Sequence, residues 1–314
     1  MTFRFYFDGI KIDRAAHLRR DSDWSGAHAG TSETRIVPIW RDQSLVMAGA
    51  QPQAVFVDAG NAQALCDAAS CTVFLGLDNG VAYYAIDLSH HEDPTQLPLP
   101  AGSMFEDLRK LASNLDQVEA GKLAYGRALA FWHRTHQFCG VCGSATKPGK
   151  GGHERVCLNE ACGKHHFPRT DPAVIMLVTN GDRCLLAHRA GNAQPMYSTL
   201  AGFVEPAESL EEAVAREVLE EVGLRVHDVR YQSSQPWPFP AQLMLGFRAE
   251  TKDESFRLQE DEISDARWFT RDELRRVLAA EETGEPVLFD GAEVRMARSI
   301  SIARRLVVEW IDEG

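Results

Sequence analysis

Glutamates recur at fixed offsets in the run GFVEPAESLEEAVAREVLEEVGL, which extends from Gly202 to Leu224. Glu217, Glu220 and Glu221 stand at i, i+3 and i+4, so on a helix they share one face. Carboxylates beside an apolar stripe repel one another and lose solvent, and both effects are unfavourable. Such an arrangement is stable only where a positive charge lies among the carboxylates. Hard divalent cations such as Mg²⁺ or Mn²⁺ bind carboxylate oxygens, commonly together with substrate phosphates. The run therefore predicts a metal site for phosphate chemistry.

A second cluster of potential ligands consists of four cysteines with the spacing C-x2-C-x14-C-x4-C. Each short loop supplies two thiolates, and four thiolates complete the tetrahedral shell of a structural Zn²⁺ with no position left for a substrate. His165 and His166 follow closely and could compete as ligands. The expected zinc ligands are Cys139, Cys142, Cys157 and Cys162.

Two other interpretations of the cysteines stay open, namely four unrelated buried side chains or a zinc ribbon that binds nucleic acid. The net charge of −12 argues against a broad nucleic-acid or membrane surface. The ribbon itself offers only a modest basic surface, made of Lys147, Lys150, Arg155 and Lys164.

The run SQPWPFP, from Ser234 to Pro240, alternates three prolines with two aromatic residues. Such a run predicts a stiff, extended loop that presents flat rings, and such rings stack on a base at low entropic cost. An isolated run of this kind more often packs at an edge or binds a partner. In a chain that also carries the acidic run and the four-cysteine cluster, base stacking is favoured.

Two parts of the chain flank the cysteine cluster, a first third without catalytic motifs and an α/β part that carries the acidic run. The first third contains strand-like runs, a turn signal at Asn79-Gly80 and no catalytic motif. A polar loop is expected over 90–102, followed by a helix over 105–133 with a break near Gly121. We interpret this part as a small mixed domain that packs, dimerises or forms part of a substrate wall. Its strands are expected at 36–40, 54–57, 72–77 and 81–86.

An α/β pattern begins at Pro168. The acidic run forms a helix that ends at Gly223, Thr270–Glu273 is a capping box that begins another, and 299–310 forms a last amphipathic helix. Strands are expected at 173–178, 183–188, 198–204, 226–232, 243–250 and 266–269.

Length and composition set the remaining limits. A chain of 314 residues suggests two or three domains, and 44% apolar with 25% charged residues indicates a folded protein. No apolar run has the length of a membrane span, and no signal-peptide pattern opens the chain. The clustered cysteines indicate a reduced compartment, so the expected location is cytoplasmic.

The acidic run meets every fixed position of the Nudix box, G-x5-E-x7-R-E-U-x-E-E-x-G-U, where U is a bulky apolar residue. The alternative is an ordinary amphipathic helix with a solvated acidic face. The family that the run resembles hydrolyses nucleoside diphosphates linked to another group, and SQPWPFP resembles the hallmark of its NADH pyrophosphatase branch. The matched positions are Gly202, Glu208, Arg216, Glu217, Val218, Glu220, Glu221, Gly223 and Leu224.

The resemblance covers the whole chain and implies an α/β (α+β) fold. A Nudix α/β/α sandwich with a mixed sheet is expected over 169–314. A four-Cys zinc ribbon over 134–168 and an N-terminal mixed α/β domain over 1–133 precede it. The implied activity is metal-dependent hydrolysis of the pyrophosphate bond of NADH or NAD⁺ to nicotinamide mononucleotide and AMP. The alternatives are removal of NAD caps from RNA 5′ ends and hydrolysis of another nucleoside diphosphate derivative. A homodimer and no membrane partner are expected.

The resemblance also assigns residues. Glu220 or Glu217 is the candidate base, Arg216 orients a glutamate through a bidentate pair, and Glu208 is an outer ligand or a helix cap. The Mg²⁺ or Mn²⁺ ligands are Glu217, Glu220, Glu221, Glu262 and Ala201, and the catalytic set is Glu217, Glu220, Glu221 and Arg216. Substrate contacts are Phe167, Ala201, Gln235, Pro236, Trp237, Pro238, Phe239, Pro240, Ala241, Gln242 and Ala303.

One substrate position departs from the family pattern, because Gln242 stands where the family usually has serine. A longer side chain there bears on the choice between NADH and related dinucleotides. A non-enzymatic sensor built on a decayed Nudix fold would have lost glutamates from the box, and none is lost.

Overall fold

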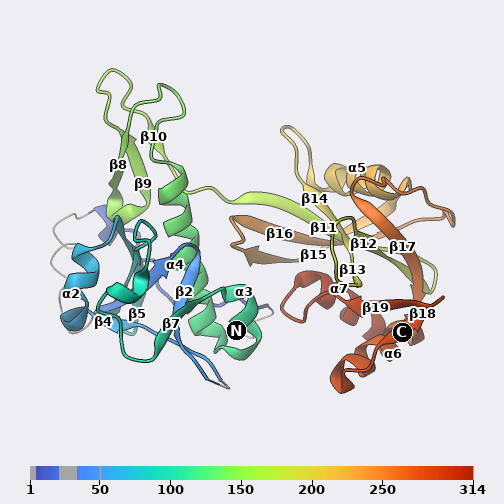
Figure 1. Cartoon of the computed structure of the whole chain (residues 1–314). Helices are drawn as coiled ribbons and strands as arrows, with labels where there is room; N and C mark the ends of the chain where they lie inside the picture. The colour runs from blue at the N-terminus through green and yellow to red at the C-terminus, as the bar shows by residue number, and fades with distance from the viewer. Residues whose placement is uncertain (1–4, 21–33, 50, 314) are drawn as a thin grey trace. The chain divides into compact units, whose positions relative to one another are not determined.

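A computed structural model describes residues 5–20, 34–49 and 51–313 of the chain (Figure 1). By internal contacts the chain divides into two compact units. The first contains Met1–Thr170 and Pro238–Ala241, and the second contains Asp171–Trp237 and Gln242–Gly314. Within the described ranges, no helix is long and apolar enough to cross a membrane.

The first unit is built on a seven-stranded mixed sheet with the order β3-β2-β1-β6-β5, in which β4 also pairs with β1 and β7 with β2. Strands β1 and β6 are parallel, and the other pairs are antiparallel. The expected turn between β5 and β6 is present, with φ of 50° at Asn79 and 83° at Gly80. The strands are β1 Thr34–Trp40, β2 Gln43–Met47, β3 Gln53–Ala54, β4 Val57–Asp58, β5 Cys71–Asp78, β6 Val81–Asp87 and β7 Ser103–Glu106.

The strand expected at 54–57 is divided between β3 and β4, because these two short strands pair with different neighbours, β2 and β1. The loop expected over 90–102 contains one short 3-10 helix. The helices of this unit are η1 Leu18–Arg20, α2 Ala59–Asp67, η2 Pro94–Gln96, α3 Leu108–Leu111, η3 Ala112–Asn114 and α4 Gln117–Thr135.

The single helix expected over 105–133 with a break at Gly121 is wrong. Phe105 lies in β7, and the break precedes α4, whose first turn is capped by the Asp116 carboxylate through the amides of Val118 and Glu119. Gly121 lies inside α4, where a Cβ would be 3.4 Å from the Cα atom of Ile10. The glycine therefore allows close packing and does not end the helix.

The zinc-ribbon segment belongs to the first unit and forms a three-stranded sheet with the order β10-β9-β8. Arg155 of the ribbon is buried. Its Nε atom lies 2.7 Å from Oγ1 of Thr146, and its Nη1 atom lies 2.9 Å from Nδ1 of His133 in α4. His133 in turn bonds the carbonyl of Gly152 through Nε2. The ribbon elements are β8 Thr146–Gly149, η4 Lys150–Gly152, β9 Glu154–Cys157 and β10 His165–His166.

The second unit holds a nine-stranded mixed sheet with the order β15-β16-β11-β12-β13-β19-β18, in which β14 also pairs with β11 and β17 with β12. The pairs β11–β16 and β13–β19 are parallel and the others antiparallel. The strands are β11 Asp171–Asn180, β12 Arg183–Arg189, β13 Met196–Ser198, β14 Leu200–Phe203, β15 His227–Trp237, β16 Gln242–Glu250, β17 Ile263–Thr270, β18 Val287–Phe289 and β19 Ala292–Met296.

Helices α5 Leu210–Val222 and α7 Ile302–Asp312 cover opposite faces of this sheet (Figure 1). Val174 and Met176 of β11 face α5 and form a core with Val214. On the other face, a Cβ at Gly246 would lie 2.8 Å from Cδ1 of Ile302, so the glycine lets α7 approach the sheet. A third helix, α6 Arg271–Thr283, begins with the expected capping box. This layered, mixed α/β architecture confirms the expected fold class.

The proline–aromatic run is not one loop, as the sequence predicted. Ser234–Trp237 extends β15 and pairs antiparallel with β16, so that Pro236 lies opposite Leu243. Strand β15 is at the sheet edge, where a proline removes no ladder bond from the sheet interior. Only Pro238–Ala241 forms the connection between the two strands.

Candidate active site and zinc centre

Helix α5 carries the acidic face and is fixed at both ends. Ser209 and Glu212 form a capping box at its start, and Gly223 ends it with φ of 70°. At its last turn, the amide of Gln259 donates to the carbonyl of Glu221 over 3.0 Å. This bond satisfies a helix-end carbonyl and holds the loop before Glu262 against α5.

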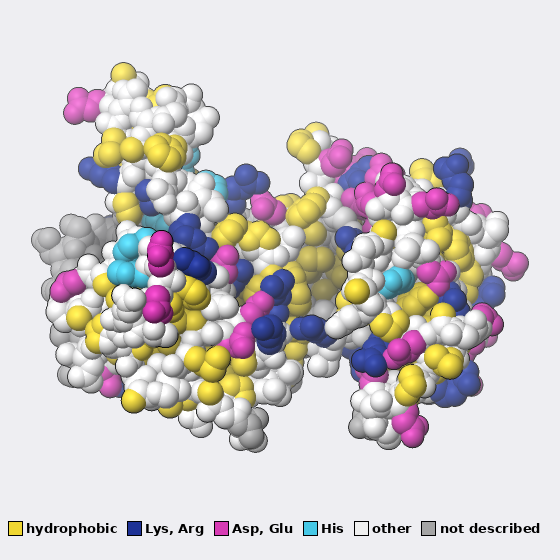
Figure 2. Space-filling model, viewed as in Figure 1, with side chains coloured by type: hydrophobic (Ala, Val, Ile, Leu, Met, Phe, Trp, Pro, Cys, Tyr) yellow, Lys and Arg dark blue, Asp and Glu magenta, His cyan; other side chains and the backbone are white. Residues whose placement is uncertain are grey.

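A cavity of about 800 Å³ lies within the second unit, beside the acidic face of α5. Figure 2 shows acidic side chains gathered around α5 with basic side chains among them. The cavity wall contains the predicted acidic set together with Arg216, and its remaining lining comes from the sheet and nearby loops. The carboxylates that line it are Glu205, Glu217, Glu220, Glu221 and Glu262.

Glu221 is the most buried of these carboxylates, with 1% of its surface exposed. Among the described residues its Oε2 atom has no hydrogen-bond partner, and its Oε1 atom lies 3.4 Å from Nη2 of Arg189. Burial raises the pKa of Glu221 to about 7; Arg189 lowers it, and Glu217 and Glu262 raise it further. A buried carboxylate oxygen without a donor fits a cation ligand.

Glu217 lies directly over Gly202 of β14. A Cβ at Gly202 would stand 1.9 Å from the carboxyl carbon of Glu217, so only glycine leaves room for this carboxylate. Burial raises the pKa of Glu217, while Arg216 acts in the opposite direction.

Arg216 makes five hydrogen bonds inside the protein, which match the five donors of a guanidinium. Two form a bidentate pair with Glu208, at 2.7 and 2.9 Å. Nη1 donates to Glu217 over 2.8 Å and to Glu220 over 3.0 Å, and Nη2 donates to the Phe203 carbonyl. Arg216 therefore orients carboxylates, and Glu208 serves as its anchor.

This donor set suits a hard divalent cation. The ligands offered are carboxylate oxygens, and one of them, on Glu221, is buried without a partner. Glu220 and Glu262 are exposed at the same cavity, so they can move toward a bound ion.

The cavity contains some of the predicted substrate residues. Ala201, Trp237 and Gln242 line it. Gln235 is fully buried, and its amide bonds the carbonyl of Ile300 and the amide of Ile302, each over 2.7 Å. Its side chain therefore fixes the start of α7.

The other predicted substrate residues range from buried to exposed. Ala303 is 3% exposed within α7. In the first unit, the Phe239 ring lies 5.4 Å from the ring of Phe7 and 4.8 Å from the guanidinium carbon of Arg127. Phe167, also in that unit, is 60% exposed. Pro236 and Pro240 are exposed, Pro238 is buried and Ala241 is half-buried.

The sequence did not point to several residues of the cavity. Arg189, at the end of β12, donates from Nη2 to the carbonyl of Ala201 over 2.5 Å besides facing Glu221. Thr199 has a buried hydroxyl with no hydrogen-bond partner in the part of the chain that the structure describes. For Arg189, the one signal in the sequence was a basic residue at the end of a strand that precedes the box. Further lining residues of this kind include Asn192, Met196, Ser198, Met244 and Gln259.

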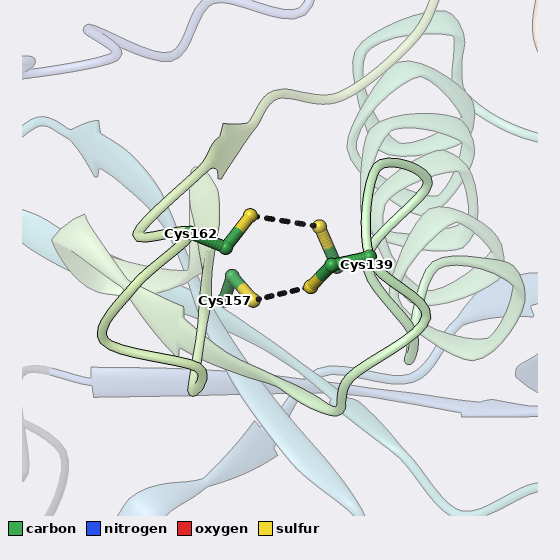
Figure 3. Close-up of side chains that lie close together, drawn as sticks. Cys139, Cys157 and Cys162 are labelled. Carbon is green, nitrogen blue, oxygen red and sulfur yellow. Dashed lines mark hydrogen bonds between the residues drawn. The ribbon is translucent and has the colours of Figure 1, made fainter.

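The four cysteines of the ribbon come together at its end (Figure 3). Their sulfurs all lie within 4.8 Å of one another, with Cys139 and Cys162 3.8 Å apart and Cys142 and Cys157 3.4 Å apart. A tetrahedral zinc ion bound at about 2.3 Å places its sulfurs about 3.8 Å apart, so this group fits a structural zinc.

The two histidines near the cysteines are not needed for a complete shell. His165 bonds Glu154 over 3.2 Å, and His166 Nε2 lies 3.3 Å from the sulfur of Cys139. The wide second loop turns at Asn159, whose carbonyl accepts from the amide of Cys162.

Comparison with protein families gives three matches along the chain. An NADH pyrophosphatase-like rudimentary NUDIX domain matches residues 33–132, an NADH pyrophosphatase zinc ribbon domain matches 134–167, and a NUDIX domain matches 169–290.

Individual relatives agree with these families. The NAD-capped RNA hydrolase NudC of Mycobacterium bovis (strain BCG / Pasteur 1173P2) is 40% identical over 307 residues, which cover 96% of this chain and 93% of that protein. The NAD-capped RNA hydrolase NUDT12 of Macaca fascicularis is 42% identical over 63% of this chain and 43% of that protein. A solved NUDIX hydrolase from Nitrosomonas europaea covers 51% of this chain and 98% of its own, with 23% identity and a TM-score of 0.39. The chain belongs to the Nudix hydrolases, in the family of NudC with its NADH pyrophosphatase-type zinc ribbon.

Proposed function

We propose that this Nudix hydrolase cleaves the pyrophosphate bond of NADH or NAD⁺, giving nicotinamide mononucleotide and AMP. The observation that carries the proposal is the buried oxygen of Glu221, unpartnered among the described residues, in a cavity that also holds four further box or loop glutamates and Trp237. A charged diphosphate explains the metal-ligand set, and the indole of Trp237 provides a flat surface for a base or nicotinamide ring.

Mg²⁺ or Mn²⁺ would be held by Glu217, Glu221 and Glu262, with the Ala201 carbonyl beside them. When bound, such an ion neutralises charge on the diphosphate and lowers the pKa of water. Arg216 orients Glu217 and Glu220 through its bonds at 2.8 and 3.0 Å. Glu220 is the proposed proton acceptor, because it is exposed at the cavity and Arg216 bonds it through Oε2.

Arg189 is a further candidate for contact with the diphosphate. Its side chain is 58% exposed, lines the cavity and is held at the carbonyl of Ala201. Binding of a cation at Glu221 would release the guanidinium from that carboxylate, so it would be available to a phosphate oxygen. Gln242 and Met244 lie on the sheet side of the same cavity and are placed to select the group beyond the phosphates. Phe167, Pro236, Pro238–Ala241 and Ala303 stay substrate contacts predicted from the sequence.

NAD-capped RNA is the second candidate substrate. It is supported by the names of NudC and NUDT12, and it requires the same bond cleavage at the same site. A cytoplasmic location and a homodimer stay predictions from the sequence, and sedimentation velocity of the purified chain tests the second.

A substrate panel tests the proposal. NADH, NAD⁺, ADP-ribose, FAD, a diadenosine polyphosphate and NAD-capped RNA are compared by kcat/KM with Mg²⁺ or Mn²⁺, and the products are identified. We expect the highest value for a substrate with an NAD moiety, with AMP or 5′-phosphorylated RNA as one product. A clear preference for a compound without two nucleoside ends would overturn the dinucleotide assignment.

A further inference from the structure

The sheet of the zinc ribbon has an outer face that no role described above explains. The amide of Leu158 donates to the carbonyl of Ala145 over 2.9 Å, so these two residues are neighbours across the strands. On its other side, Ala145 forms an isolated antiparallel bridge with Phe138. One pair further along, Lys147 lies opposite Val156. Because alternate residues of a strand share a face, these five side chains lie on one face of the sheet.

The opposite face of the sheet is the one that packs. It carries Arg155, which bonds α4 through His133, and the zinc ligand Cys157. The outer face is open by contrast: Phe138 is 67% exposed and Leu158 is 52% exposed. Figure 2 shows hydrophobic side chains in a band across this part of the ribbon, with basic side chains beside it.

The charge of the ribbon is opposite to that of the whole chain. Residues 134–168 contain five Lys or Arg and two Glu, whereas the chain carries a net charge of −12. One of the two acids, Glu154, already bonds Lys150 over 2.7 Å and His165 over 3.2 Å. Glu154 lies on the outer face, two residues before Val156, and the other acid, Glu160, lies in the loop between the last two cysteines; directly opposite Lys147 is Val156.

We propose that this outer face, made of Phe138, Ala145, Lys147, Val156 and Leu158, binds single-stranded RNA. An exposed ring on a rigid sheet stacks a base of any type, and a lysine in the next row is placed for the adjoining phosphate. A second copy of this chain fits less well, because two basic ribbons brought face to face would repel each other. The role in removing NAD caps rests on the proposed function, whereas the binding of RNA does not.

Fluorescence anisotropy tests the binding directly. The probe is an unstructured RNA of about 20 nucleotides with a 5′-monophosphate and a 3′ dye, titrated with the full chain without Mg²⁺ or Mn²⁺, so that no turnover is involved. We expect F138A to weaken binding about ten-fold, and K147E to weaken it and to reduce the slope of log K against log salt by about one. The matched controls L288S and K252E change exposed residues of the second unit and should bind as the wild type does.

Kinetics separate this inference from the proposed function. F138A and K147E should lower kcat/KM for NAD-capped RNA about ten-fold and leave kcat/KM for free NADH unchanged. Wild-type affinity for the RNA probe in both variants, at unchanged zinc content and melting temperature, would overturn the inference even if NADH is hydrolysed. A shift from dimer to monomer in sedimentation of either variant would overturn it too, since the face would then join two copies. Failure of the wild type to cleave any NAD compound would overturn only the proposed function.

Discussion

At the scale of single residues, Glu221 combines high burial with an oxygen that nothing in the described protein satisfies. In the absence of a cation, ionising such a group in a dry site is unfavourable. The carboxylate is therefore expected to reduce the stability of the metal-free protein, and its presence there is explained by the cation that it would bind.

The pH dependence of unfolding tests whether the Glu221 carboxylate destabilises the metal-free protein. Burial raises the pKa of Glu221 from an ordinary 4.5 to about 7, so between these values the folded state binds more protons than the unfolded state. Stability of the metal-free protein therefore falls as pH rises through this window, and the full loss is present above pH 7. In buffer without divalent cations, E221Q should be more stable than the wild type at pH 8, on the order of 3 kcal/mol, and equally stable below pH 4.5. Denaturant unfolding at both pH values measures the difference; a less stable E221Q at pH 8 would contradict it.

Gly202 gives a second prediction for one residue. In G202A the new Cβ would occupy the position of the Glu217 carboxylate, so the side chain must leave its place over β14. We expect kcat/KM for NADH to fall about a hundred-fold or more, with the secondary structure retained. G60A is the matched control, since nothing lies within 4 Å of its added Cβ. Near-normal activity of G202A would show that the position of Glu217 is not critical.

At the scale of elements, the buried contact between Arg155 of β9 and His133 of α4 joins the zinc ribbon to the N-terminal sheet and helix. Burial lowers the pKa of His133 to about 4 from an ordinary 6.5. The ring is therefore neutral at pH 7, with Nδ1 accepting from Arg155 and Nε2 donating to the carbonyl of Gly152.

This neutral histidine should make the protein sensitive to acid. Between pH 6.5 and 4 the unfolded state binds the proton that folded His133 excludes, so stability falls as pH falls through this window. H133Q should be less stable than the wild type at pH 7, by about 1–3 kcal/mol, and should lose less stability between pH 7 and pH 5. The urea midpoints at the two pH values measure both effects. An equal loss in the two proteins would show that His133 does not titrate in this window.

Local signals were read correctly from the sequence. The box helix ends at Gly223, the capping box begins α6, and Asn79-Gly80 makes the turn between β5 and β6. Each depends on residues adjacent in the chain, so its chemistry is visible in a short window.

The errors concern distant partners. Gly121 was interpreted as a helix break, but it accommodates Ile10, which lies more than 100 residues earlier. Ser234–Trp237 was interpreted as a loop because prolines disfavour interior strands, yet its edge position in the sheet permits pairing. Arg189 was missed for the same reason, since only the sheet register brings β12 to the helix face that carries Glu221. Contacts set by register cannot be read from spacing along the chain.

At the scale of the whole molecule, the zinc centre should stabilise the first unit, because the ribbon closes over four thiolates and packs on α4. C139S should lower zinc content and melting temperature together, since a structural zinc contributes directly to folding. C66S, at a half-buried cysteine outside the cluster, is the control and should keep its zinc. An unchanged melting temperature for C139S would argue against a metal centre there.

The central claim is that the acidic face of α5 cleaves a dinucleotide at its pyrophosphate bond, and one measurement tests it most directly. NADH is incubated with the wild type, E221Q and the exposed-position control E211Q in the presence of Mg²⁺ or Mn²⁺, and the products are separated and quantified. The wild type and E211Q should form AMP and reduced nicotinamide mononucleotide in equal amounts, and E221Q should be slower by about a thousand-fold. Release of reduced nicotinamide with ADP-ribose, or E221Q activity within about ten-fold of the wild type, would contradict the account.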